Sequence, residues 1–258
     1  MIIDTHCHLY LPEFDDDREE MLQRAEVIGV KNFMLPNIDS SSIAPMLSLC
    51  KEHSSSCFPM MGLHPCSVKE NWKTESREIE RHLLDQKQKW YGIGETGLDY
   101  FWDKTFIDQQ KENFQAHIDW AKQLRLPIII HSRDALDDCI IMIRKNKDEN
   151  LEGIFHCFSG TTEQANQIME LGFYLGIGGV VTFKNSGLDK VLEEISLSHV
   201  VLETDSPYLS PVPFRGKRNE SSYLKFVVRK ISEIKKIPEE EIAEITTRNA
   251  KKVFQITA

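Results

Sequence analysis

The chain opens with Ile2-Ile3-Asp4-Thr5-His6-Cys7-His8, in which two apolar residues lead into a pair of histidines. Ile2 and Ile3 are typical of a buried strand, and successive side chains of a strand point to opposite faces. His6 and His8 are therefore expected to point into one space and Cys7 to the other side. Two imidazoles that converge at a strand end can hold a metal ion. Two buried histidines bonded to the backbone are an equally good interpretation of this motif alone, so the rest of the chain must decide.

A short apolar run followed by a helical pattern repeats along the rest of the chain. Further strands are expected at 31–36, 57–63, 90–94, 128–130, 153–155, 173–177 and 200–202. Helical spacing occupies 16–30, 40–53, 76–86, 106–125, 135–147, 161–171 and 188–195. Two more helices close the chain, the second with Pro238 in its first turn.

Eight strand–helix units predict a parallel sheet that is covered on both faces. An open, doubly wound sheet is the alternative, but eight units in 258 residues fit a closed barrel better. No linker or change in composition divides the chain. The sequence therefore predicts an α/β fold, a (β/α)8 TIM barrel that forms a single domain over residues 1–258.

Composition limits the possible partners and the compartment. The chain has no apolar run long enough to span a membrane, and its six cysteines contain no C-x-x-C pair. No secretion signal is expected at the start, so the sequence predicts a soluble, cytoplasmic protein, and we expect a monomer. The net charge of −9 argues against broad, charge-driven binding of nucleic acid. It does not exclude a phosphate substrate, because bound cations are not part of that count.

Chemically active side chains follow the predicted strands, at the end of a barrel where active sites lie. They are His6 and His8 after the first strand, His64 after the third, Glu95 after the fourth, His131 after the fifth, His156 after the sixth and Asp205 after the eighth. Five of the nine histidines occupy such positions. Together these residues predict a site for two divalent cations with room for water.

Each of these residues also has a structural interpretation. Glu95 could cap a turn, and an aspartate such as Asp205 before Ser206-Pro207 often forms one. Glu203 lies two residues before Asp205 and could be the ligand in its place. We favour Asp205 because it lies closer to the mouth of the barrel.

Seven sequence blocks, in this order, resemble the motifs of the TatD family. They are Asp4-Thr5-His6-Cys7-His8-Leu9, Gly62-Leu63-His64-Pro65, Gly94-Glu95-Thr96-Gly97-Leu98-Asp99-Tyr100, His131-Ser132-Arg133-Asp134-Ala135, Phe155-His156-Cys157-Phe158-Ser159-Gly160, Glu203-Thr204-Asp205-Ser206-Pro207-Tyr208-Leu209 and Arg215-Gly216-Lys217-Arg218-Asn219-Glu220. The resemblance implies a TIM-barrel metal-dependent hydrolase of the amidohydrolase kind, with nuclease activity. The sequence departs from the family's motifs at two positions, Cys66 after His64-Pro65 and Ser221 after Asn219-Glu220. Neither residue is a candidate metal ligand, so these departures concern substrate contacts.

The resemblance also implies a role for each candidate residue. His6, His8 and Asp205 would hold one metal ion, and His131 and His156 the other. Glu95 would bridge both ions, where the wider superfamily has a carbamylated lysine. The ions could be zinc, magnesium or manganese.

Such a site could hydrolyse a phosphodiester with a water activated by two metal ions. Asp205 and Glu95 are then the catalytic residues, with Asp205 accepting the proton of the water. His64 and Arg215 are expected to bind the substrate phosphate. Tyr100, Phe101 and Trp102 could stack on a base or pack as a lid.

The favoured function is a metal-dependent deoxyribonuclease that cleaves DNA from the end of a single strand. The alternative is a metal-dependent ester hydrolase such as a D-aminoacyl-tRNA deacylase, so the partner is DNA or tRNA and not a membrane. A non-catalytic metal-binding module is the least favoured function, because structural zinc sites fill their coordination with four protein ligands, mostly cysteines.

Overall fold

The computed structural model describes residues 1–85 and 87–256, and its centre is a set of short parallel strands. In this part of the chain the strands are β1 (Ile2–Asp4), β2 (Val30–Pro36), β3 (Cys57–Met60), β4 (Ile93–Asp99), β5 (Ile128–Arg133), β6 (Gly153–Phe155), β7 (Tyr174–Ile177) and β8 (Val200–Leu202). Neighbours in the chain pair in parallel within β1–β3 and within β4–β8.

Backbone hydrogen bonds join these two groups of strands at both seams. Beyond β3, the amide of Met61 donates to the carbonyl of Gly92 over 3.1 Å. Beyond β1, the amide of Thr5 donates to the carbonyl of Leu202, the last residue of β8, over 2.9 Å. The strand order is therefore cyclic, and the predicted (β/α)8 TIM barrel is confirmed.

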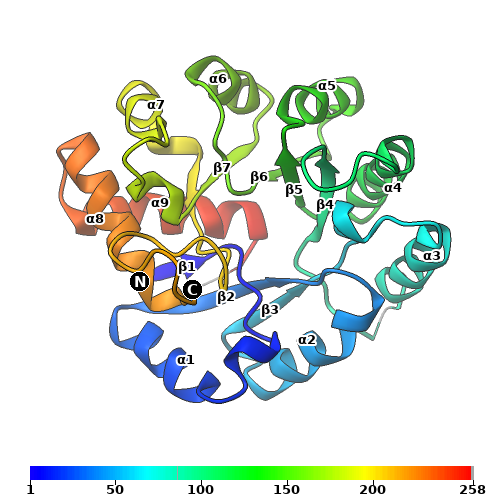
Figure 1. The fold of residues 1–258 in the computed structure, drawn as a ribbon, viewed down its shortest axis with the longest axis horizontal. Coiled ribbons are helices and arrows are strands. Elements are labelled where there is room, and N and C mark those ends of the chain that lie inside the picture. The colour runs from blue at the N-terminus through cyan, green and yellow to red at the C-terminus, as the bar shows by residue number, and fades with distance from the viewer. Residues whose placement is uncertain (86, 257–258) are drawn as a thin grey trace.

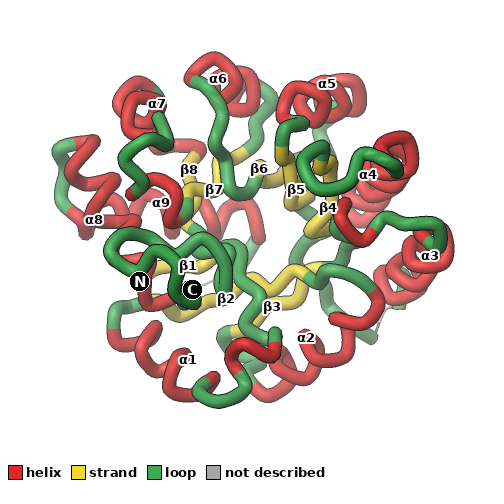
Figure 2. Tube along the Cα trace, viewed as in Figure 1, coloured by secondary structure: helices red, strands yellow, loops and turns green. Residues whose placement is uncertain are grey.

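Helices surround the strands (Figure 1). They are α1 (Arg18–Val27), α2 (Ser40–Glu52), α3 (Trp72–Leu83), α4 (Ile107–Leu124), α5 (Leu136–Asn146), α6 (Thr162–Glu170), α7 (Leu188–Glu194), α8 (Leu224–Lys235) and α9 (Glu239–Phe254). Figure 2 shows the strands grouped at the centre and most helices in an outer ring. Within residues 1–85 and 87–256, none of these helices combines the length and apolar character needed to cross a bilayer.

The barrel interior is apolar and closed at one end. Ile3, Met60 and Ile129 are buried there, and they belong to one cluster with Val253 and Phe254 of α9. This helix covers the amino ends of the strands, with which it shares contacts at β1 and β8. Polar side chains therefore collect at the opposite end, where the strands finish.

Two predicted strands extend further than expected. The fourth strand was predicted at 90–94 but runs from Ile93 to Asp99, so Glu95 lies inside the strand rather than after it. His131 likewise lies inside β5. The extension arises because β4 and β5 stay paired as far as Asp99 and Arg133. A side chain at Gly97, whose φ is +138°, would overlap the carbonyl oxygen of His131, so glycine permits this close pairing.

Other boundaries differ by a few residues. The helix predicted at 16–30 ends at Val27, and Val30 already belongs to β2. The strand predicted at 57–63 stops at Met60. The helix predicted at 76–86 begins at Trp72, and its predicted end at residue 86 lies outside the described residues. Pro238 is the N-cap of α9 and not a first-turn residue, because its extended ψ of 148° precedes the helix.

Candidate metal centre

Glu95 lies at the centre of the polar cluster that fills the open end of the barrel. Its Oε2 is 3.1 Å from Nε2 of His6 and 3.5 Å from Nε2 of His8. Its Oε1 is 2.9 Å from Nδ1 of His131 and 2.8 Å from Nε2 of His156. One buried carboxylate thus faces two pairs of imidazoles, one pair on each oxygen.

Asp205 reaches the same cluster from the loop after β8. Its Oδ1 lies 3.7 Å from Nε2 of His6 and 3.6 Å from Nε2 of His8. Its amide donates to the carbonyl of His6 over 2.9 Å, which holds the loop against the chain that follows β1. His6, His8 and Asp205 therefore form a compact group of possible metal ligands.

Glu203 is placed differently from Asp205. It is buried behind His156, where Oε1 accepts the amide proton of Cys157 and lies 3.5 Å from Nδ1 of His156. Residues two apart share a face only within a strand, and here β8 ends at Leu202 and Asp205 has a φ of 57°. Glu203 faces the outer nitrogen of His156, whereas Asp205 faces the inner nitrogens of its two histidines.

The hydrogen bonds of His8 leave a lone pair directed into the site. Tyr10 donates its hydroxyl proton to the carbonyl of Pro36 over 2.7 Å. Its oxygen therefore accepts from Nδ1–H of His8, at 3.0 Å. The Nε2 of neutral His8 is then unprotonated, which is the form that binds a metal ion.

His131 has the same arrangement with a carboxylate in place of the tyrosine, and His156 has a carboxylate close to its outer nitrogen. Nε2 of His131 lies 2.9 Å from Oδ2 of Asp99, and Nδ1 of His156 lies beside Glu203. The outer nitrogen of His131 thus donates its proton to Asp99 and leaves the inner nitrogen free, whereas Nδ1 of His156 only faces Glu203, at 3.5 Å. Partners of this kind orient the histidine ligands of metal sites and make them more basic.

His64 has the opposite tautomer. Its Nδ1 accepts the amide proton of Cys66 over 3.0 Å, so Nε2 carries the proton and points at Oε1 of Glu95, 3.2 Å away. Burial lowers the pKa of His64, which favours this neutral form. His64 belongs to a group of possible ligands with Glu95 and His131, but in this tautomer it offers a hydrogen bond and no lone pair.

The spacing of the inner nitrogens fits divalent cations. Nε2 of His6 and Nε2 of His8 are 3.3 Å apart, and Nδ1 of His131 is 3.4 Å from Nε2 of His156. Two nitrogens at about 2.1 Å from a tetrahedral zinc are about 3.4 Å from each other. His6, His8 and Asp205 on one side, and His131 and His156 on the other, would hold two ions with Glu95 between them.

The electrostatics of the cluster couple metal binding to protons. Burial lowers the pKa of His8, but hydrogen bonds to Asp205 and Glu95 outweigh it and raise the pKa to about 10. Burial likewise raises the pKa of Glu95, yet the charge of His156 and the hydrogen bond from His131 hold it well below its usual range. Without a cation His8, His131 and His156, whose pKa values are raised, carry the protons that neutralise the carboxylates. A metal ion must displace them, so its affinity falls as the pH falls.

Residues outside the cluster fix its position. Asp4 is buried below it and accepts hydrogen bonds from Thr204 and from Ser221, the latter over 2.7 Å. Burial raises the pKa of Asp4 to about 7. On the other side, His117 of α4 accepts the amide proton of Leu63 over 3.0 Å and so holds the residue before His64.

Asp99 and Tyr10 are residues for which the sequence predicted no role at the metal site. A signal existed for Asp99, because it lies four residues after Glu95 on one strand and so on the same face. No such signal existed for Tyr10, because the orientation of its hydroxyl is set by the carbonyl of Pro36 on β2.

The basic loop 215–218 divides into two parts. Arg218 is bound by Asp17, with contacts of 2.6 and 2.8 Å. Arg215 is exposed, and its guanidinium lies 4.0 Å from the ring centre of Phe183. It forms no ion pair within residues 1–85 and 87–256, which leaves its N–H groups free to meet a ligand.

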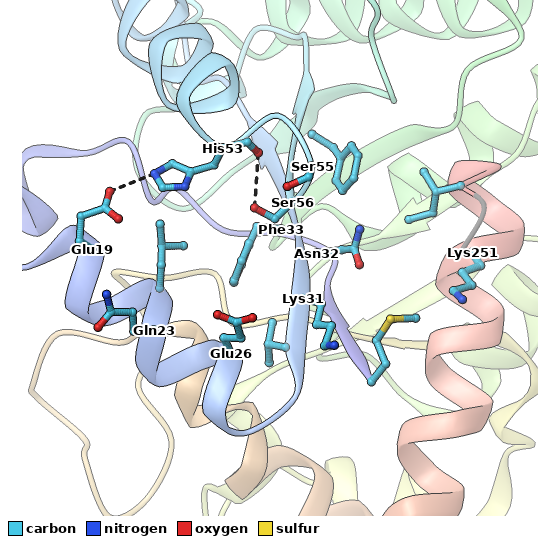
Figure 3. Close-up of a pocket in the computed structure, with 15 residues that line it drawn as sticks. Glu19, Gln23, Glu26, Lys31, Asn32, Phe33, His53, Ser55, Ser56 and Lys251 are labelled. Carbon is cyan, nitrogen blue, oxygen red and sulfur yellow. Dashed lines mark hydrogen bonds and ion pairs between the residues drawn. The ribbon is translucent and has the colours of Figure 1, made fainter.

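A cavity at the other end of the barrel includes none of these residues. It measures about 660 Å³ and lies between α1, the start of β2 and the turn before β3. Figure 3 shows its polar lining, in which Glu19 pairs with His53 over 3.0 Å. Its charged groups are of both signs, Glu26 and Lys31 among them, and no group of metal ligands lies in its described lining.

The chain is similar to known proteins over nearly its whole length. The family model described as TatD related DNase matches residues 3–255. The chain is 42% identical over 257 residues to the uncharacterized metal-dependent hydrolase YabD of Bacillus subtilis, with 99% of this chain and 100% of that protein covered. It is 32% identical over 261 residues to the uncharacterized metal-dependent hydrolase YcfH of Escherichia coli, with 100% and 97% covered.

The fold is that of a solved TatD homologue. The crystal structure of YjjV from Escherichia coli K12 superposes with a TM-score of 0.93 at 29% identity, with 99% of this chain and 98% of that chain covered. Since the family model spans nearly all of the chain, this protein is a metal-dependent hydrolase that belongs to the family of TatD related DNases.

Proposed function

We propose that the protein is a metal-dependent phosphodiesterase that hydrolyses DNA from the end of a single strand. One observation carries the proposal: Glu95 places each carboxylate oxygen against a separate pair of imidazoles. This is a ligand arrangement for two ions that share a bridging carboxylate. Divalent ions held by these residues would supply an activated water and stabilise the charge that develops in a phosphoryl transfer.

The side chains of the cluster supply the remaining parts of the reaction. Asp205 is the more open carboxylate, with 15% of its side chain exposed against 4% for Glu95, and it would accept the proton of the attacking water. The Nε2–H of His64 would donate to a phosphate oxygen. Arg215 would bind a neighbouring phosphate with two parallel hydrogen bonds.

The decisive experiment compares substrates on protein freed of metal and reloaded with zinc, manganese or magnesium. The substrates are single-stranded DNA labelled at either end, the matching duplex and a D-aminoacyl-tRNA. We expect metal-dependent release of nucleotides from the single strand and no turnover by Glu95→Ala. Hydrolysis of the D-aminoacyl ester with no cleavage of DNA would overturn the proposal in favour of a deacylase.

A further inference from the structure

Two aromatic side chains stand in solvent next to the candidate metal centre. Phe101 and Trp102 follow β4 after Tyr100 and are 50% and 67% exposed. Lid packing, one of the two roles expected for them, would cover the rings. An indole exposed to this extent is unfavourable, because burying apolar surface would gain about 25 cal/mol of free energy for each Å². The rings are therefore available to a partner with a flat apolar face.

Arg133 adds a cation to these rings. Its guanidinium carbon lies 4.0 Å from the ring centre of Phe101 and 5.2 Å from that of Trp102. Arg133 is exposed, and no carboxylate of residues 1–85 and 87–256 pairs with it. A guanidinium that stacks on rings is held in place while its N–H edge stays free, and that edge matches a phosphate.

A single carboxylate connects these residues to the metal cluster. Oδ1 of Asp99 accepts the amide protons of Phe101 and Trp102 over 2.9 and 3.0 Å. Oδ2 of the same group lies 2.9 Å from Nε2 of His131. Arg133 follows His131 by two residues on β5 and so shares its face. The aromatic pair is thus held beside the centre on the β4–β5 side of the mouth, where Figure 1 shows the two strands adjacent.

The geometry points to a nucleotide-binding site that rests on the proposed function and extends it. We propose that Phe101, Trp102 and Arg133 bind one unpaired nucleobase and its phosphate, in a single-stranded nucleic acid whose scissile phosphate lies at the metal cluster. The base stacks on the exposed indole and the phosphate meets the guanidinium. Bases inside a duplex have both faces covered by their neighbours, so this site selects single strands.

A binding experiment tests the site without turnover. The probe is an octathymidylate with phosphorothioate linkages, added to metal-loaded protein while tryptophan fluorescence is recorded. We expect quenching that disappears in Trp102→Phe, although Trp72, Trp90 and Trp120 remain. Trp102→Ala should weaken binding roughly 5- to 150-fold, the range that stacking of one base corresponds to. Leu84→Ala removes a side chain that is 53% exposed at the end of α3 and serves as the control with unchanged affinity. Full quenching in Trp102→Phe, or undiminished affinity in Trp102→Ala, would overturn the site.

A second measurement separates this proposal from the proposed function. The turnover of single-stranded DNA is compared with that of a strand carrying an abasic nucleotide next to the cleaved bond. We expect the wild type to prefer the complete strand and Trp102→Ala to lose that preference while still cleaving both. Cleavage with an undiminished preference in Trp102→Ala overturns the nucleotide site and leaves the phosphodiesterase. Quenching at Trp102 without any cleavage overturns the phosphodiesterase and leaves the site.

Discussion

The carboxylate of Asp99 lies 2.9 Å from His131, on the ring nitrogen that points away from Glu95. It fixes the tautomer of His131 and directs the other nitrogen into the site. A partner of this kind is worth about 10- to 100-fold in metal affinity.

Asp99→Asn should therefore weaken metal binding about 10- to 100-fold while the protein stays folded. The measurement is the dissociation constant of zinc in competition with a chelator. Asp148→Asn, which removes a surface carboxylate paired with Lys122, is the matched control and should keep the wild-type constant. Equal affinity in Asp99→Asn and the control would show that Asp99 does not orient a ligand.

Glu95→Ala should lower the occupancy of both metal sites and abolish turnover, because one carboxylate contacts both pairs of imidazoles. Elemental analysis after reconstitution should find two divalent ions per chain in the wild type and fewer in the variant. Full metal content with normal rates would contradict the bridging role.

Asp205→Asn should lose about 10²- to 10⁴-fold in kcat even at saturating metal, because an amide cannot accept the proton of the attacking water. The rate is measured across a metal titration, with Glu203→Gln as the comparison. Near-normal kcat of Asp205→Asn at high metal concentration would show that Asp205 only binds metal and does not accept the proton. A larger loss of kcat in Glu203→Gln than in Asp205→Asn would identify Glu203 as the proton acceptor.

Arg215→Ala should raise KM for single-stranded DNA far more than it lowers kcat, because the guanidinium is exposed and stacked on Phe183. Arg218→Ala is the control from the same loop, since Asp17 already binds that side chain. It should leave KM unchanged. A drop in kcat of Arg215→Ala at constant KM would exclude a role confined to binding.

The stability of the fold should depend on His117 below neutral pH. Burial lowers the pKa of this histidine from 6.5 to about 4, so the unfolded chain binds the proton that the folded chain excludes. Stability is then complete above pH 6.5 and declines as the pH falls toward 4, by about 2 kcal/mol between pH 8 and pH 5. His117→Gln keeps an acceptor for the amide of Leu63 but has no imidazole to titrate. Its free energy of unfolding should therefore fall less between pH 8 and pH 5 than that of the wild type. Urea unfolding of both proteins at pH 8 and pH 5 measures these free energies. An equal loss in the wild type and the variant would show that His117 does not cause the pH dependence.

The architecture was predictable because it depends on local patterns. Short apolar runs alternating with amphipathic helices are compatible with few folds. Strand ends were less predictable, as β4 shows: pairing between Asp99 and Arg133 extends it past Glu95, and that pairing joins residues far apart in the chain.

The sequence alone also determined that His6, His8, His64, Glu95, His131, His156 and Asp205 meet, because the carboxyl ends of barrel strands all lie at one mouth. Only the tertiary structure decided what each nitrogen does there. His8 and His64 look alike in the sequence, yet they differ in the structure. The hydroxyl of Tyr10 accepts from Nδ1 of His8 and leaves Nε2 unprotonated, whereas the amide of Cys66 donates to Nδ1 of His64 and leaves the ring proton on Nε2. A tautomer is set by the partner of the other ring nitrogen, and Tyr10 is itself set by the carbonyl of Pro36 on another strand. Contacts of that kind exist only once the barrel has closed.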